Sequence, residues 1–431
     1  MDILLTNGSL LVMIAAVVGF FMAWGIGAND VANAMGTSVG SKALTIKQAI
    51  LIAMVFEFAG AYLAGGEVTS TIRKGIIDAS YFVDTPELLV FGMISALFAA
   101  ATWLLIASIL GWPVSTTHSI VGAIIGFAAV GVSPDTVVWS EVVGIVGSWV
   151  ITPLISGIIA FIIFNSAQKL IFDTDKPLVQ AKRYVPMYMF LAGFVLSLVT
   201  IKKGLKHIGL ESLDIGFTVL DLEAAGGYYL AIFIAALLAL IGKFFINKID
   251  FDLNADKTTH YADVEKVFAL LMVVTACCMA FAHGSNDVAN AIGPLAAVVS
   301  IVDNGGEIAK KSAIAWWILP LGGFGIVAGL ALFGHKVIAT IGNGITHLTP
   351  SRGFAAELAA ACTVVIASGA GLPISTTQTL VGAVLGVGMA RGIAAINLGV
   401  VRNIVISWVI TLPIGAGLSI IFFWIMKAVF S

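Results

Sequence analysis

Charged residues are scarce in this sequence. Asp, Glu, Lys and Arg make up 11% of its 431 residues, whereas hydrophobic residues make up 59%. A soluble globular domain carries about 25% charged residues, so the composition excludes an ordinary water-soluble globule. It predicts an all-α polytopic membrane protein instead. The formal net charge of −2 shows no basic excess, and no nucleic-acid partner is expected.

Cysteine is equally rare. The sequence contains three cysteines, Cys277, Cys278 and Cys362, and all of them fall within apolar runs. Their spacing fits neither a metal site nor a disulfide framework. We interpret them as packing residues and expect the protein to bind no cofactor.

What the sequence does contain is a series of apolar runs of about 20 residues, the length that crosses the hydrocarbon core of a bilayer. The first run lacks a basic leader, so it is predicted to be a retained spanning helix and not a cleaved signal. We expect a multi-pass protein of the plasma membrane (the cell inner membrane), embedded in the lipid bilayer. The candidate spans cover residues 8–28, 46–65, 88–110, 114–131, 141–164, 186–202, 225–246, 267–283, 312–333, 354–370, 374–390 and 400–427.

Basic residues suggest how these spans are oriented, since Lys and Arg favour cytoplasmic loops. The two long basic stretches are 165–186 and 243–266, and both become cytoplasmic if the N-terminus lies outside. The loop with Lys42 and Lys47 then falls inside as well. The pair at 73–74 and the cluster at 202–206 land near the outer side and argue against this orientation.

Internal repetition is the strongest organisational signal. GANDVANA at 27–34 recurs as GSNDVANA at 284–291, and PVSTTHSIVGAIIG at 113–126 recurs as PISTTQTLVGAVLG at 373–386. The order of the blocks is kept, which indicates a duplication of about five spans. A first repeat at 1–165, a linking pair of helices at 166–266 and a second repeat at 267–431 are predicted. An odd-numbered unit repeated in this way predicts two inverted-topology repeats with broken helices at the midplane, as in many secondary transporters.

The duplicated octet places polar side chains on one side of a helix, because residues three and four apart are neighbours there. Carboxylate and amide oxygens suit a small hard cation, and an ionisable group inside a membrane is expected to be functional. The alternative is that each set only holds helices together. The predicted cation ligands are Asn29, Asp30, Asn33, Asn286, Asp287 and Asn290.

The second duplicated block predicts a helix start. Pro113 and Pro373 suit the first turn of a helix, and hydroxyls follow beside free backbone N–H groups. A helix N-terminus attracts anions without any lysine, although the hydroxyls could equally be simple helix caps. The predicted residues of this oxyanion site are Ser115, Thr116, Thr117, Ser375, Thr376 and Thr377.

The charges of the two blocks lead to a mechanism. Neither block contains Lys or Arg, and an oxyanion would meet two further negative charges at Asp30 and Asp287. Helix dipoles cannot offset that total, so cations must enter together with the anion. The sequence therefore predicts cation-coupled symport, and not an enzyme.

The paired octets and the paired P-x-S-T-T blocks resemble the inorganic phosphate transporter (PiT) family, over essentially the whole chain. The resemblance implies a multi-pass symporter of inorganic phosphate with co-transported sodium ions, or with protons, by alternating access. Phosphate versus sulfate or arsenate stays open, as do the stoichiometry and a homodimer. A proton-coupled phosphate or sulfate permease, a channel and an intramembrane aspartyl protease using Asp30 and Asp287 are the rival interpretations.

Four titratable residues lie beside these blocks or within spans. His118 and His283 abut the motifs, but Gln378 and Ile26 stand at the corresponding positions of the other repeat. Neither histidine therefore belongs to the duplicated core, although a proton relay through them is conceivable. Glu57 and Glu357 lie inside apolar spans and are functional candidates by that position alone, but the sequence names no partner for either.

Overall fold

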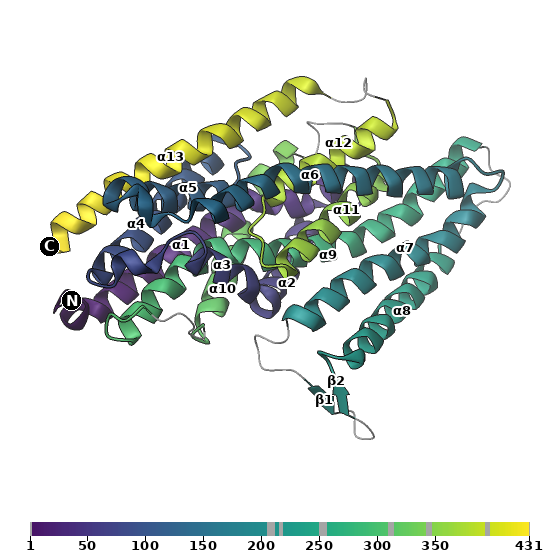
Figure 1. Cartoon of the computed structure of the whole chain (residues 1–431). Helices are drawn as coiled ribbons and strands as arrows, with labels where there is room; N and C mark the ends of the chain where they lie inside the picture. The colour runs from purple at the N-terminus through teal and green to yellow at the C-terminus, as the bar shows by residue number, and fades with distance from the viewer. Residues whose placement is uncertain are drawn as a thin grey trace.

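The computed structural model describes residues 2–204, 212–214, 219–249, 257–308, 314–341, 347–392 and 397–430. Most of these residues are helical (Figure 1). The helices are α1 (Asp2–Gly40), α2 (Ile46–Ala64), α3 (Gly66–Lys74), α4 (Pro86–Leu110), α5 (Thr116–Gly126), α6 (Trp139–Ala167), α7 (Pro177–Val199), α8 (Ala225–Asn247), α9 (Lys257–Asp303), α10 (Ile318–Ile341), α11 (Pro350–Gly369), α12 (Thr376–Ala390) and α13 (Leu398–Phe430).

Short elements connect some of the helices. Two strands, β1 (Ser212–Asp214) and β2 (Val219–Asp221), pair antiparallel between α7 and α8, with Leu213 opposite Leu220. The remaining short elements are single turns of 3-10 or π helix, namely η1 (Ala79–Phe82), η2 (Phe127–Val132), η3 (Pro134–Thr136), η4 (Gln168–Phe172) and η5 (Thr200–Gly204).

The prediction of an all-α polytopic membrane protein is confirmed. Among the described residues, ten helices are long and apolar enough to cross a membrane. Apolar side chains also face outward, as on α6, where Val150, Leu154 and Ile158 are each about 60% exposed. Their four-residue spacing places them on one stripe of the helix, which is the face that lipid would cover.

The count of twelve spans is not confirmed. The predicted spans 114–131 and 374–390 correspond to shorter apolar helices, Thr116–Val132 and Thr376–Ala390. At 1.5 Å per residue, neither reaches across a hydrocarbon core of about 30 Å. Both are instead the second arm of a helical hairpin that turns back inside the protein.

The first hairpin consists of α4 and α5. Its two open ends lie together, because the ring of Phe127 packs directly on Gly92 near the start of α4. The C-terminal end of α13 lies at the same place, since Phe127 stacks with Phe423 and Phe91 stacks with Phe430, each at 5.8 Å between ring centroids. The chain therefore enters along α4 and returns along α5 to the end from which it came.

The second hairpin consists of α11 and α12, and it enters from the opposite end (Figure 1). Arg352 in the first turn of α11 and Arg391 after α12 lie close enough to interact electrostatically. Val384 near the end of α12 shares a cavity with Val400, close to the start of α13. The broken helices that the sequence predicts are thus present, and their opposed entry favours the inverted repeats, which stay a prediction.

The tips of the two hairpins meet. Each first arm ends in a glycine with a left-handed backbone, Gly111 at φ +67° and Gly371 at φ +73°, a conformation that glycine adopts without a steric penalty. Across the contact, the hydroxyl of Thr117 donates to the carbonyl of Ile374 at 2.8 Å. Two helix starts from distant parts of the sequence are thereby brought side by side.

Helices of the two predicted repeats exchange partners. The first repeat's α1 packs on α10 and its α5 on α13, while α9 packs on α2 and α12 on α6. Glycines permit the closest approaches: a Cβ on Gly27 would lie 1.9 Å from the carbonyl oxygen of Ile326, and one on Gly284 would lie 2.2 Å from that of Glu57. The regions 1–165 and 267–431 therefore share one core, and α7 and α8 of the linking region pack beside it.

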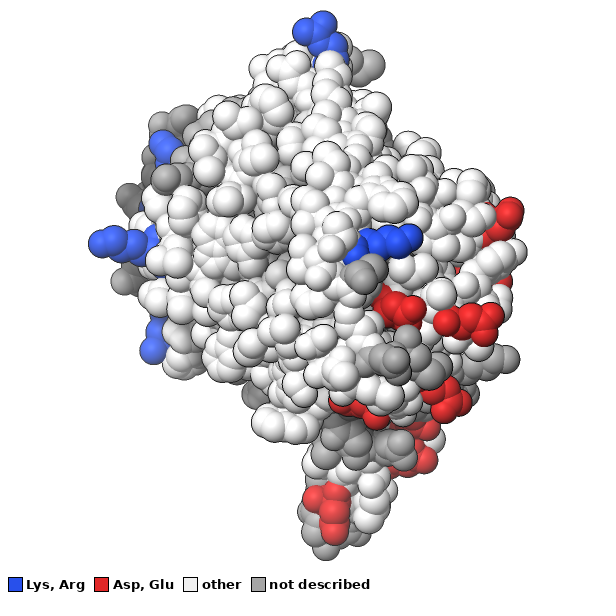
Figure 2. Space-filling view, turned by 90° about the vertical axis from the view of Figure 1, so that its left-hand side faces the viewer, with Lys and Arg blue, Asp and Glu red and all other residues white. Residues whose placement is uncertain are grey.

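Both termini lie at one end of the helix bundle, and the turn between α6 and α7, which carries Lys169 and Lys176, lies at the other (Figure 1). Figure 2 looks onto the end with the termini. Most of that surface is uncharged, and Asp and Glu side chains gather along one side of it and towards the β1–β2 hairpin. Lys and Arg side chains also lie on this face, at its opposite side, at its top and near its middle (Figure 2), and the orientation with the N-terminus outside stays a prediction.

Candidate functional site

The first polar set, Asn29, Asp30 and Asn33, lies in the middle of α1, and each residue is about 1% exposed. The amide nitrogen of Asn29 donates to the hydroxyl of Ser108 at 3.2 Å and to the carbonyl of Trp112 at 3.1 Å. Its amide oxygen accepts from the backbone N–H beyond that turn. Asn29 thus fixes the tip of the α4–α5 hairpin.

The second polar set, Asn286, Asp287 and Asn290, repeats this geometry on α9. The amide nitrogen of Asn286 donates to the hydroxyl of Ser368 at 2.9 Å and to the carbonyl of Leu372 at 3.2 Å. Ser108 and Ser368 were not among the predicted site residues, although the repeat contained the signal. The tripeptide IAS precedes both tips, at 106–108 and at 366–368.

Each polar set also reaches the helix start that belongs to the other repeat. The amide nitrogen of Asn33 donates to the hydroxyl of Thr377 at 2.7 Å, and that of Asn290 donates to Thr116 and Thr117 at 3.3 and 3.2 Å. The structure therefore brings the predicted cation ligands and the predicted anion ligands into one cluster.

Several oxygens of the polar sets remain free. The buried side-chain atoms that accept no hydrogen bond from the described residues include one oxygen each of Asp30, Asn286, Asp287 and Asn290. An unpaired buried oxygen is costly unless a ligand completes its coordination, and carboxylate and amide oxygens are hard-cation ligands. The amide nitrogens hold the helices together, and the free oxygens of Asp30, Asn286, Asp287 and Asn290 stay candidate cation ligands. The amide oxygen of Asn29 already accepts a hydrogen bond.

The six hydroxyls at the helix starts have distinct roles. Ser115 and Ser375 cap their own helices, since each hydroxyl accepts from the backbone N–H three residues on, at 3.2 and 3.3 Å. Thr117 and Thr377 join the two hairpin tips. Thr376 donates to the carboxylate of Asp287 at 2.8 Å, which links a helix start directly to an ion-site candidate.

One feature of the site occurs in a single copy. His283 lies between two carboxylates, with Nδ1 3.2 Å from Oε2 of Glu57 and Nε2 3.0 Å from Oδ2 of Asp287, and all three side chains are fully buried. In the other half, Ile26 and Ile326 occupy the corresponding positions. Sequence reasoning named no partner for either His283 or Glu57, because the two residues are far apart in the chain.

Asp30, His283 and Asp287 form a compact group. Each contributes one potential ligand atom, and these atoms lie within 4.8 Å of one another. The two aspartates therefore do not belong to separate distant sites. They converge on one place between α1 and α9, where a positive charge would relieve the repulsion between their carboxylates.

Glu357 is a buried residue of α11. It contacts α1 at Thr37 and Ser38, one helical turn after the first polar set. Its carboxylate accepts from the hydroxyls of Thr37, Ser38 and Thr275, with a distance of 2.5 Å to Ser38 and 2.8 Å to Thr275. Hydroxyls rather than a cation satisfy this carboxylate. Leu97 stands at the corresponding position of the first repeat, so this network also lacks a counterpart.

His118 is a packing residue in this structure. Its ring lies on the indole of Trp149 with 3.8 Å between centroids, and Nδ1 is 3.3 Å from the carbonyl of Trp408. Among the described residues, its ring forms neither a hydrogen bond nor an ion pair with a carboxylate. The proton relay that the sequence left open therefore has no geometric support at His118.

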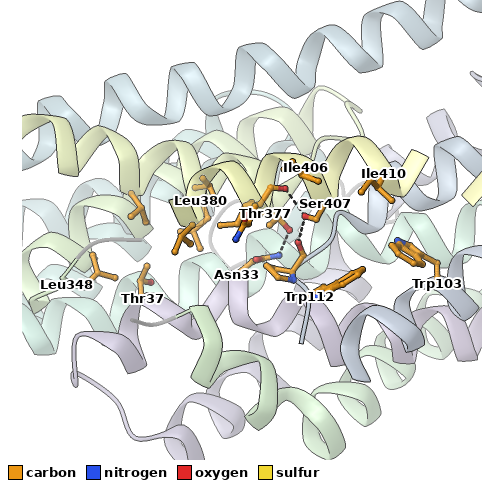
Figure 3. A pocket seen from close by; sticks show the side chains of 16 residues that line it. Asn33, Thr37, Trp103, Trp112, Leu348, Thr377, Leu380, Ile406, Ser407 and Ile410 are labelled. Carbon is orange, nitrogen blue, oxygen red and sulfur yellow. Dashed lines mark hydrogen bonds between the residues drawn. The ribbon is translucent and has the colours of Figure 1, made fainter. Parts of the chain in front are cut away.

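A cavity of about 410 Å³ leads to the cluster between α1, α4, α12 and α13. Asn33 and Thr377 lie in its middle, as Figure 3 shows, and apolar side chains such as Leu380 and Ile410 form most of its walls. None of the described residues that line the cavity is Lys or Arg. An anion that enters here must be held by N–H groups, hydroxyls and co-bound cations.

This chain is similar to known phosphate transporters and permeases. Residues 26–419 match the phosphate transporter family. A chain of Haemophilus influenzae named "Putative phosphate permease" is 59% identical over 100% of both chains. The chloroplastic inorganic phosphate transporter 2-1 of Arabidopsis thaliana is 45% identical over 96% of this chain and 72% of its own length. A solved structure described as "The sodium-dependent phosphate transporter" is 41% identical, with a TM-score of 0.87 over 97% of this chain and 99% of that chain.

A helical membrane fold with a buried polar cluster, together with these similarities, defines a multi-pass membrane transporter and not an enzyme. The protein belongs to the phosphate transporter family. The intramembrane aspartyl protease is therefore set aside, even though Asp30 and Asp287 lie near each other.

Proposed function

We propose that this protein is a secondary active transporter that moves inorganic phosphate together with sodium by alternating access. The observation that carries the proposal is the free oxygen on each of Asp30 and Asp287, in a buried cluster that adjoins two hydroxyl-bearing helix starts. The match to the phosphate transporter family and the similarity to a solved structure described as a sodium-dependent phosphate transporter support it.

Charge balance determines the order of events. Two buried carboxylates without a Lys or Arg among the lining residues of the cavity repel a phosphate anion. Sodium ions that bind to the aspartate and asparagine oxygens neutralise this charge and create a positive surface for the anion. Cations therefore bind before phosphate or together with it, and this order couples the two fluxes.

Phosphate is held at the paired helix starts. The first turns of α5 and α12 present backbone N–H groups and the positive ends of their helix dipoles. The hydroxyls of Thr116 and Thr376 contact Asn290 and Asp287, respectively, so cation and anion sites share neighbours. Ser115 and Ser375 serve mainly as caps that keep these helix starts in place.

The coupling ion is tested by uptake into proteoliposomes. Radiolabelled phosphate is measured under an imposed sodium gradient and, separately, under a proton gradient without sodium. We expect concentrative uptake with sodium alone, and sulfate or arsenate as competitors report the breadth of the anion site. Uptake driven equally well by protons without sodium would replace sodium with protons in the proposal, and non-concentrative flux would indicate a channel.

Inverted topology is tested in intact cells, where we propose a position in the inner membrane with the N-terminus outside. A cysteine placed next to Asp135, in η3 after the first hairpin, should react with an impermeant reagent from outside. A cysteine next to Arg391, after the second hairpin, should react only after the membrane is opened. Labelling of both from the same side contradicts the inverted arrangement.

A further inference from the structure

The cavity beside the cluster is larger and more apolar than phosphate requires. Its volume of about 410 Å³ lies in the range of roughly 300–1,000 Å³ that holds drug-sized organic ligands. Two of its polar residues, Asn33 and Thr377, are in the middle, and the indoles of Trp112 and Trp103 lie to one side of them in Figure 3. The space beside the anion site is therefore suited to an aromatic group.

The two indoles form an aromatic corner. Their ring centroids are 6.5 Å apart with an interplanar angle of 63°, and aromatic rings favour such edge-to-face and offset arrangements. The indole N–H of Trp103 already donates to the hydroxyl of Thr411 at 3.2 Å. What Trp103 offers to the cavity is consequently its apolar ring surface.

We propose that this cavity binds organic anions in which one phosphonate or phosphate group carries a single aromatic ring. The anionic group lies at Asn33 and Thr377, and the ring packs against Trp112 and Trp103. This inference rests on the proposed function only for the anion end; the aromatic corner is an independent feature of the structure.

Binding of such a compound has a consequence for transport. Alternating access requires α12 and α13 to close over the anion from this side, and a bound ring occupies the space between α13 and α4 that closure must remove. Phenylphosphonate is therefore a competitive ligand that is not transported.

The experiment measures displacement of radiolabelled phosphate from the purified protein in sodium buffer. Phenylphosphonate is compared with methylphosphonate, which has the same anionic group without the ring. Burial of roughly 60 Å² of phenyl surface corresponds to about a tenfold gain in affinity, so we expect phenylphosphonate to displace phosphate at about a tenfold lower concentration. Equal potency of the two compounds would overturn the proposal.

Variants locate the ring. Trp112→Ala is suitable because this side chain is 47% exposed, so its removal leaves the packed core in place, and Trp103→Leu removes the other wall. Either change should reduce the phenylphosphonate advantage to less than threefold and leave phosphate affinity within threefold. Trp316→Ala, at a tryptophan that is 84% exposed and does not line the cavity, is the matched control and should keep the advantage. An advantage that survives both cavity variants contradicts the assigned position.

Two further measurements separate this proposal from the proposed function. Calorimetric titration of phenylphosphonate in the absence of phosphate tests the cavity even if phosphate itself fails to bind, an outcome that would count against the proposed function alone. Proteoliposomes loaded with phosphate should exchange it for external labelled phosphate, whereas those loaded with phenylphosphonate should not. Equal exchange would show that the ring does not prevent closure.

Discussion

The two polar sets have the same side chains and different surroundings. In the first, Asp30 accepts a hydrogen bond from Asn33 at 3.0 Å and also interacts with the side chain of Thr116. Ile26 and Ile326 stand at the positions that correspond to His283 and Glu57. In the second, Oδ2 of Asp287 accepts a hydrogen bond from the hydroxyl of Thr376 at 2.8 Å and lies 3.0 Å from Nε2 of His283. Glu57 stands behind that imidazole in turn.

This difference teaches that a duplicated ligand set need not give two equivalent ion sites. Both aspartates lie within 4.8 Å of a ring nitrogen of His283, but Asp287 is in direct contact with the imidazole at 3.0 Å, so more of the charge of Asp287 is offset. We expect the first set to bind sodium more strongly and the second to respond more to changes in its neighbours. The predictions that follow test this inequality, from the largest expected effect to the smallest.

The largest effect is expected on stability, from the Glu57–His283 contact. His283→Ile or Glu57→Ile alone leaves the other side chain buried without its partner, which costs about 3–5 kcal/mol. The double variant places isoleucine at both positions, as Ile26 and Ile326 do beside Asp30. It should recover part of this loss, with a coupling free energy of about 1–3 kcal/mol between the two substitutions. Thermal unfolding of the four proteins in detergent measures it. Additive losses would mean that the pair does not act as a unit.

The next effect concerns the aspartates. Asp30→Asn keeps the size of the side chain but removes an anionic ligand, and we expect sodium affinity to fall on the order of 100-fold. Asp287→Asn should cost less, because His283 and Thr376 already offset part of that charge. The sodium dependence of phosphate uptake is the measurement, with Asp303→Asn at the exposed end of α9 as the control. Wild-type behaviour of both variants would make the aspartates structural, and equal losses would make the two sets equivalent.

A smaller effect is expected at the helix starts. Thr376→Val removes a donor to a buried carboxylate, which corresponds to about a tenfold loss of apparent phosphate affinity. Thr116→Val should cost less, because Asn290 still donates to Thr117 at 3.2 Å. Phosphate dependence of uptake at saturating sodium gives both values. If neither variant weakens phosphate transport by even threefold, these hydroxyls are caps and not ligands.

The smallest difference is expected between the two capping serines. Ser115→Ala and Ser375→Ala each remove a capping hydrogen bond, and the two bonds have nearly equal N···Oγ distances of 3.2 and 3.3 Å. Each substitution should lower the free energy of unfolding by about 1 kcal/mol. Thermal unfolding should therefore show the same small shift for both. A much larger fall in phosphate affinity at one serine would indicate that this hydroxyl binds the anion directly.

Hydropathy predicted the long helices correctly but not the number of crossings. Segments 114–131 and 374–390 are as apolar as spanning helices, yet their side chains are buried among other helices; Ile120 and Val387 are fully buried. An apolar composition indicates that a helix is shielded from water. It does not indicate whether lipid or other helices of the protein surround that helix. The hairpin turns could be placed from Gly111 and Gly371, whereas the direction of the returning arms could not.

The sequence by itself determined the membrane class, the duplication and the identity of the ion-ligand candidates, because composition, helical spacing and a repeated motif are local properties of the chain. Only the tertiary structure decided which oxygens stay free, which helices exchange partners and that His283 lies between Glu57 and Asp287. These contacts join residues that are up to 344 positions apart, as Asn33 and Thr377 are. Such pairings depend on how the helices pack, which no periodicity along the chain encodes.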